Sequence, residues 1–240
     1  MTTQPKSRTG KARTAARFEE IAEAAIACFT EAGYRRTQVA DIARQMGVSA
    51  GTLYLYAASK EALLHLAVMR LCGLPLEDLP VPLPDPGIGE TAALLRAKIG
   101  AHARWPLLGE ALTRASPADA STLAAIGGAL HDVLAEQRRI VWLLDSCAFD
   151  IAELNEIHRQ QVRGAYIDDL VALIGRGAAP DWTETKLRVA ARCAIEIVAW
   201  AAMHRRRERP FAHEATCPEE AEARDVASRL FASALMAVRN

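Results

Sequence analysis

The sequence is short of cysteine, lacks long apolar runs and carries no familiar catalytic motif, and each absence excludes a class of protein. Its five cysteines among 240 residues are odd in number and widely spaced, with no Cys-x-x-Cys pair, which argues against a disulfide framework and a zinc site. No run of about eighteen apolar residues occurs, and the N-terminus has no apolar secretion signal. We therefore expect a cytoplasmic protein with no membrane partner.

Motifs of catalysis and cofactor binding are absent as well. There is no phosphate-cradling glycine loop, no Gly-x-Ser-x-Gly and no His-Glu-x-x-His pair. Asp150, Glu153 and His158 would lie near one another on a helix, but charged residues at that spacing usually form a solvated face. We predict no enzyme, no catalytic residue, no metal and no cofactor. A metal sensor that uses histidines and carboxylates is a minor alternative.

The net charge is zero, but the charge is unevenly distributed. Residues 1–60 hold nine Lys or Arg and five Asp or Glu, a surplus of four positive charges. Residues 1–16 contain no acid and are rich in Thr, Ser, Gly and Lys. We expect this segment to be a disordered arm drawn to phosphate groups. The alternative is a solvated tail with no function.

Residues 17–72 carry the most informative pattern. Apolar residues from Phe18 to Phe29 recur at helical spacing, and Gly33 suits the end of that first helix. From Thr37, which can cap the second helix, to Tyr56, two short apolar-periodic segments are joined through Gly47. The second segment is capped by Ser49, anchored by Leu53 and lined with small and hydroxylated residues, and Ser59 can cap a fourth helix. Such a helix pair typically places its second helix in the DNA major groove, and two ordinary helices in an all-helical core are the alternative.

The rest of the chain divides into a connector and a helical domain. Residues 73–89 contain five prolines, which no helix tolerates at that density, and we expect a semi-extended connector whose apolar residues pack on the chain's own surface. A proline-rich ligand for another protein is the alternative. Residues 90–240 show helical stripes throughout, with a charged break at Glu136–Arg139, one long helix over 151–174 and two final helices over 183–206 and 218–238. The predicted fold class is all-α.

The segment from Phe18 to Leu66 resembles the N-terminal domain of the TetR family of transcriptional regulators. The resemblance rests on Ala32–Tyr34, on Thr37 with the apolar positions of the second helix, and above all on Gly47-Val-Ser-Ala-Gly-Thr-Leu-Tyr54. It continues with Tyr56 and Ser59-Lys-Glu-Ala-Leu63 and covers about a fifth of the chain. In one departure, Ala57 stands where the family usually has an aromatic residue. The packing of the third helix on the fourth is then looser, or is completed from elsewhere.

The resemblance implies roles for matching positions. Residues at the start of the recognition helix would contact base edges and the adjacent backbone, and hydroxyls and an ammonium group beside it would hold phosphates. The predicted DNA-binding residues are Thr37, Ser49, Ala50, Gly51, Thr52, Tyr54, Tyr56 and Lys60. Thr37, Tyr56 and Lys60 are those assigned to phosphates.

The last two helices are the predicted dimer surface. The first is apolar on most of its circumference, which suggests burial on more than one side. Family members pair such helices with a two-fold copy as a four-helix bundle. The predicted interface consists of Ala191, Ile195, Val198, Ala202, Phe231 and Leu235. Simple burial in the monomer core is the alternative.

The resemblance further implies a small-molecule effector bound among the middle helices, in a mostly apolar pocket. Candidate lining residues are Trp105, His131, Trp142, Cys147, Tyr166 and Trp200. The expected function is a repressor that binds a palindromic double-stranded DNA operator as a homodimer and leaves it on binding an unidentified effector, with the fourth helix as the rigid link. The alternatives are a protein-interaction module with a purely structural helix-turn-helix and a regulator with no small-molecule ligand.

Overall fold

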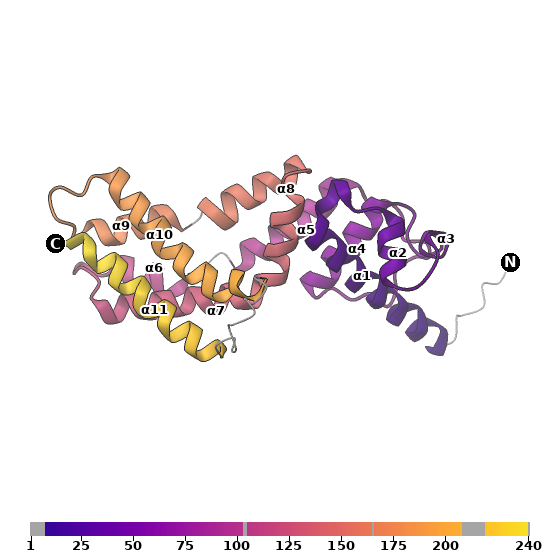
Figure 1. Ribbon diagram of the computed structural model, residues 1–240, viewed down its shortest axis with the longest axis horizontal. Helices are drawn as coiled ribbons and strands as arrows, with labels where there is room; N and C mark the ends of the chain where they lie inside the picture. The colour runs from indigo at the N-terminus through magenta and orange to yellow at the C-terminus, as the bar shows by residue number, and fades with distance from the viewer. Residues whose placement is uncertain (1–7, 103–104, 165, 208–218, 240) are drawn as a thin grey trace, which may run out of the picture. The chain divides into compact units, whose positions relative to one another are not determined.

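A computed structural model of the protein describes residues 8–102, 105–164, 166–207 and 219–239 (Figure 1). Over these residues the predicted all-α class is confirmed: no strand is present, and a single isolated bridge joins Ala57 to Leu83. The helices are α1 (Arg8–Arg36), α2 (Val39–Gln45), α3 (Ala50–Tyr54), α4 (Lys60–Cys72), α5 (Gly87–His102), α6 (Pro106–Thr113), α7 (Ala120–Cys147), α8 (Ala152–Ile157), the π-helix η1 (His158–Gly164), α9 (Ile167–Gly175), α10 (Glu184–Ala202), the 3₁₀ turn η2 (His204–Arg206), α11 (Glu220–Met236) and the 3₁₀ turn η3 (Ala237–Arg239).

The chain forms two compact units. Unit 1 comprises residues up to Gly100 together with Arg139–Gln161, and unit 2 comprises Ala101–Arg138 together with residues from Val162 onward. Helix α7 therefore contributes to both. Unit 1 is larger than the expected DNA-binding domain of residues 17–72, because α5 and the end of α7 pack with the helix-turn-helix. The two units therefore do not divide at the expected boundary between residues 73–89 and 90–240.

The core of unit 1 follows the predicted stripe of α1. Phe18, Ile21 and Phe29 are fully buried, as are Leu64 and Leu66 on α4. The helix ends are set by local chemistry. The side chains of Ser49 and Ser59 accept hydrogen bonds from the backbone N–H groups of Thr52 and Ala62, which caps α3 and α4.

Three local predictions for unit 1 need correction. Helix α1 already begins at Arg8, so much of the expected disordered arm 1–16 is helical, and residues 1–7 lie outside the described part of the chain. The cap of α2 is Gln38 rather than Thr37, in a reciprocal capping box with Asp41. The irregular connector ends at Pro86, because α5 starts at Gly87.

Unit 2 is built around α10 and α11, which run side by side (Figure 1). Phe231 of α11 is fully buried and lies against Gly127 of α7, where a Cβ atom would meet the ring at 2.9 Å. Glycine at this position therefore allows the two helices to approach closely. On the outside, Arg224 of α11 binds the carboxylate of Asp132 through two hydrogen bonds of 2.7 and 2.8 Å.

Two expectations about the middle of the chain were wrong. The charged residues 136–139 do not break α7, which is continuous from Ala120 to Cys147. Their side chains point to partners instead: Arg138 lies 3.8 Å from Glu220 in unit 2, and Arg139 pairs with Glu23 in unit 1. The single long helix expected over 151–174 is replaced by α8, η1 and α9. Among the described residues, no helix is both long and apolar enough to span a bilayer.

Candidate nucleic-acid interface and sensor unit

The recognition helix α3 has one buried anchor and an open outer face. Leu53 is completely buried, whereas Tyr54 and the following Leu55 are 50% and 66% exposed. Gly51 is exposed and has open space around it apart from its own cap, Ser49. The hydroxyls of Ser49 and Thr52 lie 3.0 Å apart at the start of the helix. The structure thus brings Ser49, Ala50, Gly51, Thr52 and Tyr54 together on one short helical turn.

Sequence reasoning missed Leu55, which exposes a large apolar side chain beside Tyr54. The sequence contained a signal for this. Leu55 follows the anchor Leu53 by two residues, so on a helical turn the two side chains point in nearly opposite directions and cannot both face the core. Apolar side chains at such a position can contact thymine methyl groups. Tyr56, in contrast, is only partly exposed, and its ring meets Phe18 edge-on at 5.9 Å.

Thr37, which was predicted to contact a phosphate, has a buried side chain. Its side chain is 1% exposed, and its hydroxyl donates to the α1 carbonyls of Gly33 at 2.7 Å and Cys28 at 3.1 Å. A threonine hydroxyl can turn back onto the preceding helical turn in this way and so compete with capping. The predicted contact between the Thr37 side chain and a phosphate is therefore wrong for this conformation.

Lys60 lies at the first position of α4 and has defined neighbours. Its Nζ atom lies 4.4 Å from the ring centroid of Tyr34 and 3.4 Å from the carbonyl oxygen of Arg35. Partial burial lowers the pKa of Lys60 below its usual range. The Tyr34 hydroxyl donates to Glu61 at 2.5 Å, and burial together with this carboxylate raises the pKa of Tyr34. Tyr34 therefore stays neutral, and its ring holds the ammonium group of Lys60 through a cation–π contact.

The end of α7 docks on the end of α1, within unit 1. The backbone N–H of Arg35 donates to Asp150 Oδ2 at 2.7 Å, and Ser146 Oγ donates to the carbonyl of Thr30 at 2.6 Å. Gly33 adopts φ = 79°, and a Cβ atom there would lie 2.8 Å from the Ser146 carbonyl oxygen. Glycine is required at this position both by the left-handed backbone and by the close approach.

Cys147, one of the predicted ligand residues, belongs to the same contact. It is fully buried, and its thiol lies 3.9 Å from the Phe29 carbonyl. Burial raises the pKa of Cys147 to about 12, so the thiol is protonated and unreactive. Trp142 also lies in the part of α7 that belongs to unit 1. Cys147 and Trp142 thus belong to unit 1, and the other four predicted ligand residues belong to unit 2.

Within unit 2, Trp105 and Tyr166 come together. Trp105 is buried and donates from Nε1 to the Ile126 carbonyl at 3.0 Å, and its ring meets Tyr166 edge-on at 5.4 Å. Phe231 completes this aromatic cluster, with ring centroids 6.2 Å from Trp105. Trp200 does not join it, because its side chain is half exposed on the surface of α10.

His131 lies in a second, polar part of unit 2. Its side chain is 1% exposed, yet its ring nitrogens make no hydrogen bond and lie 3.7 Å from Asp132 and 3.8 Å from Glu220. Burial lowers the pKa of His131, more than the two carboxylates raise it. Arg205, itself buried, donates to Glu220 Oε2 at 3.0 Å. The imidazole is therefore a neutral group surrounded by ion pairs.

The predicted dimer residues of α10 and α11 face the core of unit 2. Ala191, Val198, Ala202, Phe231 and Leu235 are fully buried within unit 2, and Ile195 is partly buried against the same core. Their burial is accounted for by the monomer, so they are not free to contact a second copy. Of the readings open at the sequence level, monomer core is the one that fits these six residues.

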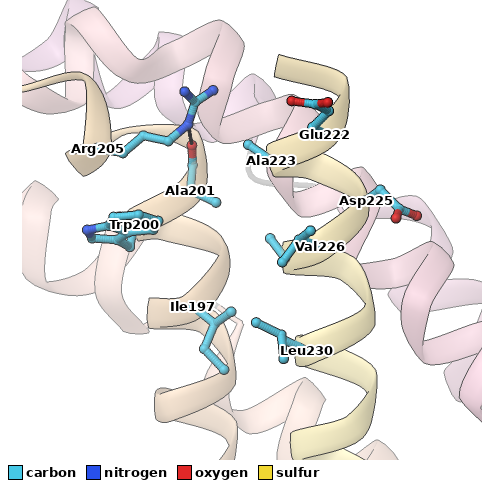
Figure 2. Close-up of a pocket in the computed structure, with 10 residues that line it drawn as sticks. Ile197, Trp200, Ala201, Arg205, Glu222, Ala223, Asp225, Val226 and Leu230 are labelled. Atoms are coloured by element: carbon cyan, nitrogen blue, oxygen red, sulfur yellow. Dashed lines mark hydrogen bonds between the residues drawn. The ribbon is translucent and has the colours of Figure 1, made fainter. Parts of the chain in front are cut away.

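The opposite face of α10 and α11 holds a groove of about 500 Å³ (Figure 2). Ile197 and Leu230 point toward one another across it, and Trp200 and Val226 lie farther along. It is lined by Ile197, Trp200, Ala201, Arg205, Glu222, Ala223, Asp225, Val226, Ala227 and Leu230. Trp200, Val226 and Leu230 are each at least half exposed, so this face leaves a row of large apolar side chains in water.

Comparison with known proteins agrees with the resemblance seen in the sequence. Residues 21–67 match the model of the family described as bacterial regulatory proteins, tetR family. The chain is 44% identical over 48 residues to the fatty acid metabolism regulator protein of Bacillus subtilis (strain 168), covering 20% of this chain and 25% of that protein. It is 38% identical over 52 residues to an uncharacterized HTH-type transcriptional regulator, YvdT, of the same strain, covering 22% and 27%. The match thus spans about a quarter of each relative's length.

Solved structures resemble the chain over a longer range. The ketosteroid transcriptional regulator KstR2 of Mycobacterium tuberculosis is 19% identical, with a TM-score of 0.48, over 93% of this chain and 95% of that one. FadR from Bacillus subtilis in complex with stearoyl-CoA is 19% identical, with a TM-score of 0.43, over 90% and 98%.

Proposed function

We propose that the chain, whose residues 21–67 match the model of the tetR family of bacterial regulatory proteins, is a non-enzymatic transcriptional repressor. It binds a near-palindromic operator as a homodimer and is released by a small, mostly apolar ligand. The observation that carries the proposal is the open face of α3, where Gly51 and Tyr54 are exposed above a fully buried Leu53. Because Leu53 anchors α3 in the core, the exposed side of the helix can enter a DNA groove without loss of packing.

DNA reading is assigned to two groups of residues. Ala50, Gly51 and Tyr54 face base edges and the adjacent backbone, with Leu55 as an added apolar contact. Phosphates are held by the hydroxylated start of α3 and by Lys60, because hydroxyls, a helix N-terminus and an ammonium group all suit phosphate oxygens. No Arg, Asn or Gln lies on α3, so part of the sequence preference comes from DNA shape.

Dimerisation is assigned to the groove face of α10 and α11. Large apolar side chains exposed on two adjacent helices are typical of an interface. A two-fold copy of this face would form a four-helix bundle. A dimer is also needed for function, because a single five-residue helix reads too few base pairs for specific binding.

Release by an effector is assigned to α7 as well as to α4. Residues 120–138 of α7 belong to unit 2 and residues 139–147 to unit 1. Asp150, three residues after the end of α7, accepts a hydrogen bond from the Arg35 N–H, and the Arg35 carbonyl oxygen lies 3.4 Å from Lys60 Nζ. Glu23 adds a second connection, since it pairs with Arg70 of α4 and Arg139 of α7. An effector that binds the DNA-free form more tightly would act through this contact, with a coupling of ~1–3 kcal/mol typical of such systems.

The test is binding of the full chain to a DNA fragment from upstream of its own coding sequence, at several salt concentrations. The proposal predicts saturable binding that weakens steeply as salt rises and exceeds binding to a shuffled fragment. A protein-interaction module with a structural helix-turn-helix would show no preference between the two fragments. Thermal-shift measurements with apolar compounds, stearoyl-CoA among them, then separate a ligand-controlled regulator from one controlled by its abundance.

A further inference from the structure

The proline-rich segment Gly73–Pro86, named here the strap, returns along α4 rather than leading away from it. Three contacts fix the register: Ser59 Oγ with Asp85 at 2.9 Å, His65 Nδ1 with Thr91 Oγ1 at 2.9 Å, and Cys72 Sγ with the Leu94 carbonyl at 4.0 Å. Residue numbers rise together on both sides, so α5 runs in the same direction as α4. The chain must therefore travel back over the length of α4, about 20 Å at 1.5 Å per residue.

On its return the strap binds the turn between α3 and α4. The Leu83 N–H donates to the Tyr56 carbonyl at 2.7 Å, and the Ala58 N–H donates to the Leu83 carbonyl at 2.9 Å. Leu83 thereby pairs with Ala57 in the parallel bridge. Both side chains are buried, with Ala57 1% and Leu83 6% exposed. The small residue at position 57, where an aromatic one was expected, is thus matched by a large residue supplied from the strap.

A carboxylate fixes the strap a second time, at the start of α4. Asp85 accepts a hydrogen bond from Ser59 Oγ at 2.9 Å and another from the Gly87 N–H at 2.8 Å. Ser59 at the same time caps α4 by accepting from the Ala62 N–H at 3.0 Å. One side chain thus joins the N-terminus of α4, where Lys60 lies, to the N-terminus of α5.

We propose that the strap is part of the DNA-reading unit, with Leu83 and Asp85 as positioning residues for Tyr54, Tyr56 and Lys60. This rests on the proposed function. A helix of five residues cannot hold its own orientation, because isolated helices shorter than about 12–15 residues are marginal in water. The strap supplies two backbone hydrogen bonds and a buried side chain at the point where α3 ends. Its buried Leu76 and Leu83 are also unavailable to another protein's aromatic groove, which disfavours the proline-ligand alternative.

The experiment is a size swap between the paired positions. Leu83→Ala, Ala57→Leu and the double variant are compared with wild type for binding to a duplex that the wild-type protein selects from a random library, and to a scrambled duplex. Leu83→Ala leaves a cavity and Ala57→Leu overfills the site, whereas the double variant conserves the volume. We expect each single variant to lose about tenfold in preference for the selected duplex, equal to about 1.4 kcal/mol, and the double variant to recover most of it. Val81→Ala, in the exposed part of the strap, is the control.

Two further measurements distinguish positioning from general stability. Hydrogen exchange of the Ala58 amide, which donates to Leu83, should accelerate in Leu83→Ala and slow again in the double variant, while helicity and dimer content stay unchanged. Asp85→Ala should also lower the preference, whereas Glu77→Ala, with the same charge change in an exposed residue of the strap, should not. If Leu83→Ala fails to fold, Asp85→Ala still tests the positioning role of the strap.

The outcomes separate the two proposals. If Ala58 exchanges faster while the preference for the selected duplex stays at the wild-type level, the strap is not a positioning element, and the proposed function is untouched. Equal effects of Asp85→Ala and Glu77→Ala would also overturn the positioning role. If the wild-type protein selects no duplex at all, the proposed function fails and removes this inference with it.

Discussion

Each unit carries a patch where large apolar side chains are exposed to water. On unit 1, Tyr54 is the last residue of α3 and Leu55 follows it, and the hydroxyl groups of Ser49 and Thr52 lie at the start of this five-residue helix. On unit 2, Trp200, Val226 and Leu230 line two helices of 19 and 17 residues. A short patch beside hydrogen-bond donors suits a nucleic-acid groove, whereas a long one on paired helices suits an identical helix pair. The two patches should therefore respond independently to substitution.

The largest expected effect is at the long patch. Leu230→Glu should convert the dimer into monomers, because a carboxylate buried without a partner in an apolar interface costs several kcal/mol. Sedimentation velocity at fixed concentration measures this. Leu107→Glu, at an exposed position of α6 in the same unit, is the matched control. Leu235→Glu should instead unfold unit 2, since Leu235 lies in its core. A Leu230→Glu dimer as stable as wild type would reject the groove face as the interface.

At the short patch, Tyr54→Ala should abolish the preference for a selected duplex while the protein remains a folded dimer. The substitution removes both ring and hydroxyl from the open face of α3. Competition binding against a scrambled duplex gives the preference, and circular dichroism checks the fold. Leu74→Ala, another partly exposed apolar residue of unit 1, should bind as wild type does. Wild-type affinity of Tyr54→Ala would show that α3 is not the reading helix.

Lys60→Ala should weaken binding to all sequences alike. The substitution removes one phosphate contact, so the slope of log affinity against log salt should fall by about one. Affinities measured over a salt series give the slope, and Lys186→Ala, an exposed lysine of unit 2, provides the control. An unchanged slope would place Lys60 away from the phosphates.

Asp150→Ala tests the link between α7 and the DNA-reading helices. Loss of the acceptor at 2.7 Å should speed hydrogen exchange of the Arg35 amide and weaken DNA binding severalfold, in line with the ~1–3 kcal/mol of typical couplings. Glu153→Ala, an exposed acid three residues farther along, is the control. If the Arg35 amide exchanges faster with no change in DNA affinity, the contact is structural and α4 alone carries the coupling.

The smallest effect is on the pH dependence of stability. Burial keeps the pKa of His131 below its usual value, so the folded state binds fewer protons than the unfolded state. The free energy of unfolding should therefore fall as the pH drops below about 6.5 and passes through the folded pKa. Urea unfolding at neutral and mildly acidic pH should show a smaller fall in His131→Leu. His65, whose pKa burial also lowers, retains its own share in that variant. An equal fall in both proteins would assign the dependence to other groups.

The sequence predicted the helix-turn-helix closely because local chemistry specifies it. The cap at Ser49, the anchor at Leu53 and the left-handed turn at Gly47 each depend on neighbouring residues alone. Thr37 was misassigned because a threonine hydroxyl has two local options, capping and bonding back, and the sequence does not distinguish them.

Features that depend on distant partners could not be predicted. Apolar periodicity suggested that the helix now seen as α10 is buried on more than one side, but hydrophobicity does not say which of its faces meets the core of the monomer. The charged residues 136–139 suggested a break because their partners, Glu23 and Glu220, lie far away in the sequence. The pairing of Leu83 with Ala57 was likewise hidden, although the missing aromatic at position 57 indicated that another residue would fill the site.

The most direct test of this account is the stoichiometry and symmetry of the DNA complex. Duplexes selected from a random library by the full chain are sequenced, and the mass of the complex with the best duplex is measured. We expect a near-palindromic site with half-sites about one helical turn, roughly 34–36 Å, apart, and an even number of copies on each duplex. A single copy on an asymmetric site, or a pool with no shared sequence, would contradict the assignment of α3 to reading and of the α10–α11 groove face to pairing.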